Sequence, residues 1–215
     1  MMRKATFLAL FLLPFLAQSQ VTDHEGRTYK TVKIGNQTWM AENLNVITFR
    51  NGDTIPAAYD EEEWALGGVF FMPARMDIDF DEENGQFFGK LYNYLAISDE
   101  RGIAPDGWRV PTDEDWNILA EALGGPAAAT AKLKSAEGWV ENNGTNESGF
   151  EGYPLGMIDE DGYYDGLGFS GYWWSITQEE EGLVINRNLA ENKFAFEKAL
   201  SSPFNGLSVR LVKID

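Results

Sequence analysis

Residues 30–44 read KTVKIGNQTWMAENL and form the most regular local pattern in the chain. Apolar residues of the strand-forming kind lie on both sides of a Gly-Asn pair that is typical of a tight turn. The pattern predicts a β-hairpin over about residues 28–40. The stretch holds amides and an acid but no nucleophile and no base, so we expect it to close the fold rather than to carry chemistry. Its four strand-forming apolar residues are Val32, Ile34, Trp39 and Met40.

The N-terminus has the pattern of a secretory signal peptide. An apolar run over residues 5–17 follows a basic start, and it is shorter than the ~20 residues that a helix needs to cross a bilayer. Ala17 and Ser19 place small residues where signal peptidase cleaves, which predicts a signal over residues 1–19 and a mature domain over residues 20–215. A membrane anchor and a buried helix are the alternatives. The chain has no Cys to carry a lipoprotein anchor, so we expect a secreted, periplasmic or outer-surface protein without stable membrane insertion.

The composition excludes several classes of function. The 17 Lys and Arg include Arg3 and Lys4, so the mature part carries 15 cations against 34 acids, a net charge of −19. Such a field repels nucleic acid and anionic lipid and favours cations or basic partners. The absence of Cys removes thiol nucleophiles and thiolate metal sites. Seven Trp, eight Tyr and 14 Phe supply enough apolar surface for a folded core.

The strongest helix signal lies in residues 107–125, GWRVPTDEDWNILAEALGG. Thr112 is placed as an N-cap, Asp115 gives a carboxylate version of the capping box, and Gly124 is placed to end the helix. A second short helix is expected over residues 127–134. We expect residues 60–86 to be irregular and residues 87–97, 172–177, 183–189 and 206–214 to be strands.

Several stretches occur together in the order and spacing of a known family. They are DHEGRTYKTVKIGNQTWMAENL, FGKLYNYLAI, APDGWRVPTDEDWNILAEALGG, GTNESGF, GYWWSIT and GLSVRLVK. In this set the chain resembles the Fibrobacter succinogenes major paralogous domain over nearly all of residues 21–215. The resemblance implies an exported protein of a family without an established general activity.

The resemblance also implies an α+β fold of the C-type lectin-like and sulfatase-modifying-factor type. That fold is a looped domain with short antiparallel strands, two helices and long irregular loops, whose first and last strands pair. Trp39 and Met40 would then be core residues, and Asn36 and Asn43 would serve turns and backbone groups. The chain departs from the family at Ala104 and Leu211, where members often carry Cys, and in a longer segment over about residues 61–84.

Acidic residues at alternate positions suggest a calcium loop. Asp77, Asp79 and Asp81 match its first half, but Glu82 and Phe88 stand where the loop requires Gly and Glu. The alternative is a solvated acidic loop. We expect no other cofactor.

Enzyme chemistry has little support in the sequence. The one His, His24, cannot supply a facial triad of metal ligands, and a Ser-His-Asp triad would have to be built on it. A pair of carboxylates for glycoside hydrolysis remains an alternative, because 34 acids allow many pairs.

Residues 144–171 contain eight glycines among many aromatics, and this segment is where we expect the binding surface. Trp173 and Trp174 should point to opposite faces of a strand, so that one is core and the other can be exposed. The alternative is that both are packed. The sequence thus predicts a non-catalytic recognition or adhesion module for glycan or protein, of unknown oligomeric state; the further alternative is a structural subunit of a surface assembly. The expected ligand-binding residues are Tyr163, Tyr164, Phe169, Tyr172, Trp173, Trp174, Asp159, Asp161 and Asp165.

Overall fold

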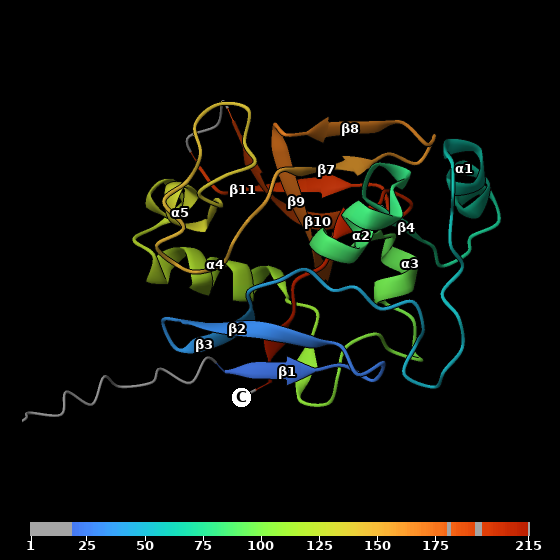
Figure 1. The fold of residues 1–215 in the computed structure, drawn as a ribbon, viewed down its shortest axis with the longest axis horizontal. Helices are drawn as coiled ribbons and strands as arrows, with labels where there is room; N and C mark the ends of the chain where they lie inside the picture. Colours follow the sequence, from blue (N-terminus) through green and yellow to red (C-terminus); the bar gives the residue numbers. More distant parts are fainter. Residues whose placement is uncertain (1–18, 180–181, 192–194, 215) are drawn as a thin grey trace, which may run out of the picture.

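The computed structural model describes residues 19–179, 182–191 and 195–214, so the predicted signal over residues 1–19 lies almost wholly outside the described residues. Two curled, mainly antiparallel sheets form the body of the molecule, with helices around them (Figure 1). The strands are β1 (Gln20–Thr22), β2 (Thr28–Ile34), β3 (Gln37–Met40), β4 (Arg75–Asp77), β5 (Lys90–Tyr92), β6 (Trp108–Arg109), β7 (Leu155–Ile158), β8 (Tyr164–Leu167), β9 (Ser170–Gln178), β10 (Val184–Ala190), β11 (Glu197–Ser201), β12 (Leu207–Ser208) and β13 (Val212–Lys213). The helices are α1 (Glu61–Val69), α2 (Glu82–Phe88), α3 (Tyr94–Ile97), α4 (Asp113–Ala122) and α5 (Pro126–Leu133), with a 3-10 turn η1 (Ile78–Phe80).

The predicted hairpin is present. β2 and β3 pair in antiparallel register, with Val32 opposite Trp39, and Gly35 takes the positive φ that the turn requires. Trp39 and Met40 are fully buried, as expected. The smaller sheet has the order β1-β2-β3-β13-β6, so the N-terminal hairpin and the last strand lie in one sheet.

The last segment is not the single strand that the sequence predicted. β12 lies in the larger sheet between β9 and β5, whereas β13 lies in the smaller sheet between β3 and β6. The three residues between them carry the chain from one sheet to the other, and all three side chains are buried. The segment is divided into two short strands because each part pairs with different neighbours, β12 with β5 and β9 and β13 with β3 and β6.

Local helix signals are confirmed where caps specify them. Thr112 and Asp115 form the predicted capping box of α4, and Gly124 follows its end with a φ of +99°.

The expectation of an irregular segment over residues 60–86 is wrong, because this segment contains α1, β4, η1 and most of α2. The predicted strand over residues 87–97 is limited to β5, with the end of α2 before it and α3 after it.

Apolar cores cover both faces of the larger sheet. The ring of Trp173 packs on the side of Trp116 and Phe150, and that of Trp174 packs on the side of Tyr92 and Leu207. The two tryptophans therefore point to opposite faces, as strand geometry predicts, and both are fully buried. The expectation that one of them can face out is wrong, because neither face of β9 is open at this position.

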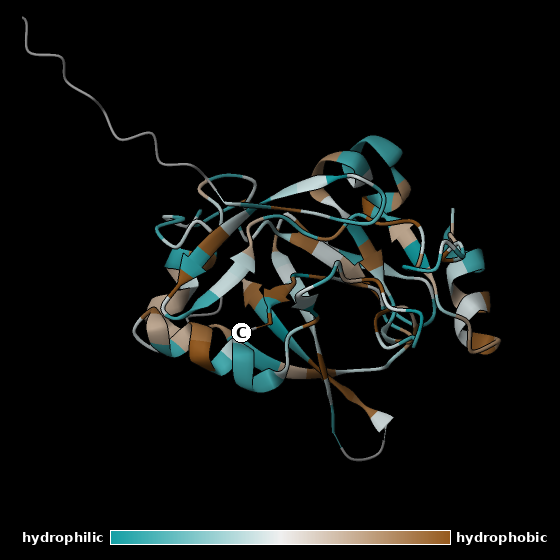
Figure 2. Cartoon of the chain, turned by 90° about the horizontal axis from the view of Figure 1, so that it is seen from below, coloured by the Kyte–Doolittle hydropathy of each residue, from teal (hydrophilic) through white to brown (hydrophobic). Residues whose placement is uncertain are grey.

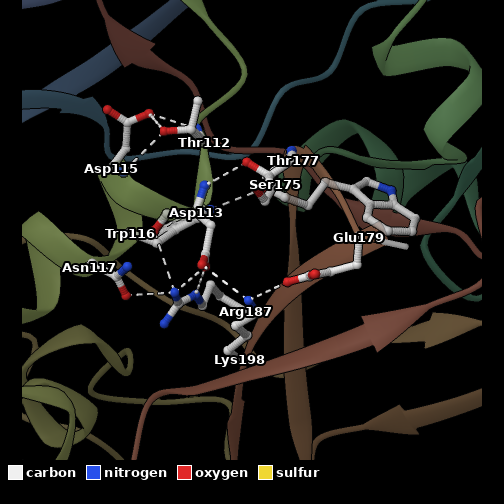
Figure 3. A network of polar contacts seen from close by, with 11 residues as sticks. Thr112, Asp113, Asp115, Trp116, Asn117, Ser175, Thr177, Glu179, Arg187 and Lys198 are labelled. Carbon is white, nitrogen blue, oxygen red and sulfur yellow. Dashed lines mark hydrogen bonds and ion pairs between the residues drawn. The ribbon is translucent and has the colours of Figure 1, made fainter. Parts of the chain in front are cut away.

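A polar network ties the start of α4 to the larger sheet (Figure 3). The backbone N–H of Asp113 donates to Thr177 Oγ1 over 3.0 Å, and its carboxylate accepts from Arg187 Nε over 3.0 Å. Arg187 also donates to Asn117 Oδ1 over 2.7 Å. One turn of the helix is thus bound to β9 and β10 by groups that are largely shielded from water.

Asp115 gives this region a pH dependence. Burial raises the pKa of Asp115, but hydrogen bonds from Arg109 and Thr112 lower this pKa by a larger amount. The pKa of Asp115 therefore lies below the ordinary value of 3.8. A depressed pKa in the folded state stabilises the fold above pH ~4, and that stability is lost as the pH falls through the folded pKa.

We expect Asp115→Asn to lower the free energy of unfolding by about 1–3 kcal/mol at pH 7, because it removes hydrogen bonds to a charged group. The difference from the unsubstituted protein should be smaller at pH 3, because the unfolded chain takes up the proton below the ordinary pKa of 3.8 and the charged carboxylate then contributes less stability. Urea unfolding at both pH values measures the difference. An equal difference at both would show that the carboxylate is not responsible.

Candidate functional site

Helix α1 stands at the edge of the molecule and touches the core through one side chain (Figure 1). Asp60 caps it by accepting from the N–H of Glu63 over 2.8 Å. Trp64 is the only buried residue of the helix, and it packs over Gly206, where a Cβ atom would lie 2.7 Å from the indole ring. Ala65, Gly67 and Gly68 are half-buried, and the other residues of α1 are exposed.

An acidic hollow of about 610 Å³ lies between the first turn of α1 and the β7–β8 turn. Gly162 allows the close approach, since a Cβ atom there would lie 2.4 Å from the carbonyl oxygen of Glu61. Among the described residues, the four carboxylates of the hollow have no cationic partner. The hollow is lined by Glu61, Glu62, Asp79, Asp161, Gly162, Tyr163 and Tyr164.

The two tyrosines of the hollow differ in exposure. Tyr163 projects, with 73% of its surface exposed. Tyr164 is half-buried, and its hydroxyl donates to the carbonyl of Leu155. Burial, together with the nearby carboxylate of Asp79, raises the pKa of Tyr164, so it is a neutral donor at any physiological pH. The hollow therefore offers negative charge, one free aromatic ring and no cation.

An apolar groove of about 270 Å³ lies along α1 and the segments that flank it. Leu66, Phe70 and Met72 contribute exposed apolar side chains to it. Val69 and Phe71 extend the apolar surface, and Phe71 meets the ring of Phe204 edge-on at 5.3 Å. Figure 2 shows α1 at the right-hand edge, hydrophilic where it begins and hydrophobic where it ends.

The structure brings together only part of the predicted binding surface. Asp161, Tyr163 and Tyr164 share the acidic hollow. Asp159 instead builds the turn, since its carboxylate accepts from the N–H groups of Asp161 and Tyr163. Asp165 is exposed on β8 opposite Met157.

The predicted aromatic platform is not assembled. Phe169 is half-exposed, but it follows the far end of β8 from Tyr163. Tyr172 packs partly against the core, and Trp173 and Trp174 are buried. Rings that alternate along β9 cannot form one exposed face when cores lie on both sides of the sheet.

The predicted calcium loop is also not formed, because its three carboxylates have separate roles. Asp77 is paired with Lys90, and Asp81 caps α2 by accepting from the N–H of Glu83 over 2.8 Å. Asp79 lines the acidic hollow. Within the described residues, no group of three His, Cys, Asp or Glu side chains can hold a metal ion. The three carboxylates are therefore not brought together in this structure, and the metal site at these residues stays a prediction.

We expect millimolar calcium to leave the melting temperature unchanged at fixed ionic strength. A site with a Kd one hundredth of the calcium concentration would add about 2.7 kcal/mol of stability. Thermal unfolding with calcium and with a chelator measures the difference. A rise of several degrees with calcium would contradict the separate roles of the three carboxylates.

Sequence reasoning missed α1 and its apolar end. A signal for the helix was present, since Asp60 precedes three acids and Trp64, as a capped helix start does. No local pattern shows that Leu66 and Phe70 stay exposed, because their exposure depends on whether distant segments of the chain pack over them.

The described structure is an α+β domain in which the first hairpin and the last strand close one sheet. A family model described as the Fibrobacter succinogenes major domain matches residues 32–213. The chain belongs to this family. No curated protein and no solved structure is significantly similar to it. None of the helices in the described part of the chain is long and apolar enough to cross a membrane.

Proposed function

We propose that the chain is an exported, non-catalytic recognition module that binds a protein partner through the surface around α1. The observation that carries the proposal is the apolar groove of α1 and its extension over Val69 and Phe71, which lie beside an acidic hollow. Contiguous exposed apolar surface with a polar border is typical of protein interaction sites. Export is inferred from the signal pattern of residues 1–19.

The charge of the surface favours a basic partner. The acidic hollow has four carboxylates that meet no cation among the described residues, and the mature chain carries a net charge of −19, with 15 cations against 34 acids. A second copy of the chain would bring equally acidic surface to the interface, at a cost in repulsion. The complementary partner is an apolar or aromatic segment flanked by Lys or Arg.

A protein partner fits this surface better than a glycan does. Sugar rings need an exposed aromatic face, and of the predicted rings only that of Tyr163 projects into the hollow. The hydrolase alternative has less support, because hydrogen bonds from Arg109 and Thr112 lower the pKa of Asp115 below its ordinary value. A general acid of a glycosidase needs a raised pKa instead. If the chain is instead a structural subunit of a surface assembly, it would bind a permanent partner through the same surface.

We further infer that the fold is a variant of the C-type lectin-like loop. The pairing of β13 with β3 supports this, because it brings the two ends of the domain into one sheet. In such a fold, elaborations of the segment between the first hairpin and α4 are free to carry binding residues. Helix α1 is one of these elaborations.

Selection from a random peptide library on residues 20–215 tests the function. We expect the selected peptides to combine an aromatic or aliphatic anchor with flanking Lys or Arg. Phe70→Ser should weaken their binding by about 2 kcal/mol, or roughly 30-fold in Kd, as loss of an interface anchor does.

Matched control substitutions separate the loss of this surface from general effects of a substitution on the domain. Leu200→Ser removes a similarly exposed apolar residue from β11 and should leave binding unchanged. Glu62→Lys should weaken binding, whereas Glu114→Lys, in the first turn of α4, should not. Peptides that bind Phe70→Ser as tightly as the unsubstituted domain would exclude α1 as the binding surface.

A further inference from the structure

A third pocket, of about 330 Å³, lies between β2, the end of α2 and the loop after α5. Its volume falls in the range of about 300–1,000 Å³ that is usual for small-molecule sites. None of its lining residues belongs to the surface around α1. The pocket is therefore a separate candidate binding site.

Arg210 forms the floor of this pocket and is almost completely buried. Its Nε donates to Asn43 Oδ1 over 2.6 Å, and Nη2 donates to the carbonyl of Glu151 over 2.9 Å. Nη1 donates to the carbonyls of Met40 and Phe150. All these acceptors are neutral, so no carboxylate in direct contact neutralises the guanidinium. Burial lowers the pKa of Arg210 to about 9, which leaves it charged at pH 7.

Two more cations stand on the wall of the pocket. Arg27 donates to the carbonyl of Gln86, which is also a neutral acceptor. The ammonium group of Lys30 contacts no acceptor among the described residues. Arg27 and Lys30 are exposed, and neither forms an ion pair with a carboxylate among the described residues. Three cations that line one pocket without a carboxylate in direct contact supply the donors that an anionic ligand requires.

The other side chains of the pocket suit the remaining parts of a sugar. Phe87, which is 77% exposed, lies beside Phe88, and Phe88 meets Tyr153 edge-on at 5.1 Å. These rings offer an apolar wall for the CH face of a pyranose. Glu42 and Glu151 line the same pocket and can accept hydrogen bonds from hydroxyl groups.

We propose that this pocket binds an acidic sugar, with the carboxylate of a uronic acid on Arg210, Lys30 and Arg27 and the sugar ring against Phe87 and Tyr153. The site is independent of the protein partner at α1. A ligand with only a carboxylate would contact the three cations but not the aromatic wall or the two acids. A neutral sugar would contact the aromatic wall and the acids but would make no ion pair with the three cations.

Titration calorimetry with residues 20–215 tests this assignment against three probes: glucuronic acid, glucose and N-acetylglycine. Glucuronic acid should bind at least about tenfold more tightly than glucose, because only the acid makes charge-assisted hydrogen bonds. It should also bind more tightly than N-acetylglycine, which has the carboxylate without the ring. Equal binding of glucose, equal binding of N-acetylglycine, or no binding of glucuronic acid would each overturn the proposal.

Two lysines of β2 supply a matched pair of substitutions. Lys30→Glu should weaken glucuronic acid binding by about tenfold or more, whereas Lys33→Glu makes the same charge change on the same strand outside the pocket and should have little effect. Both side chains are exposed, so both variants should melt as the unsubstituted domain does. Equal affinities of the two variants would show that the pocket is not the site.

Discussion

A chain that ends at Gly206 should not fold. The deletion removes β12 from between β9 and β5, and β13 from between β3 and β6, so it divides both sheets at once. It also removes four almost fully buried apolar side chains, each worth about 1.5–3 kcal/mol when buried. That sum approaches or exceeds the usual stability of about 5–15 kcal/mol for a whole domain. The four side chains are those of Leu207, Val209, Leu211 and Val212.

Circular dichroism and thermal unfolding of the shortened chain measure this effect. A chain that ends at Lys213 is the control, because it keeps both strands and loses only the half-exposed Ile214 and the terminal residue. The control should melt near the temperature of the full domain. A cooperative transition of the shorter chain at an unchanged temperature would contradict the closure of the fold by its last segment.

Arg210→Met should be the most damaging of the single substitutions considered. It keeps the side chain long and unbranched but leaves the carbonyls of Met40, Phe150 and Glu151 without their donor. Each buried polar group that loses its partner costs about 1–3 kcal/mol, so we expect a loss of about 3–5 kcal/mol in the free energy of unfolding. Urea denaturation measures this loss directly.

Arg50→Met is the matched control on the surface. Arg50 pairs with Asp106, and both side chains are largely exposed, so its loss should cost less than about 1 kcal/mol. Arg210→Lys separates charge from geometry, because lysine keeps the charge but cannot reach all the acceptors of a guanidinium. Arg210→Met within 1 kcal/mol of the unsubstituted protein would show that the buried contacts of Arg210 do not hold the fold.

The parts of the fold that the sequence predicted are those that short stretches specify. The capping box of Thr112 and Asp115 and the turn at Gly35 act within a few residues, and both occur where the pattern places them. Trp39 was expected in the core because the resemblance to a looped fold places the hairpin where the two ends of the domain meet.

The parts that the sequence did not predict depend on distant pairing. Arg210 meets Asn43 across 167 positions of the chain, and nothing near either residue indicates the contact. The burial of both Trp173 and Trp174 depends on cores that cover both faces of β9, which a single strand cannot reveal. The candidate site was predicted only in part for the same reason, since Tyr163 and Asp161 meet the unpredicted α1 rather than Phe169.

NMR mapping of a selected peptide locates the binding surface of the domain. A basic, apolar peptide titrated into labelled residues 20–215 should shift amide resonances in residues 56–74 and 161–164, which surround the groove and the acidic hollow. Resonances near Phe169 and Val140 should stay unchanged. Shifts confined to residues 144–160 and 165–171, with α1 unaffected, would exclude the surface around α1 as the binding site.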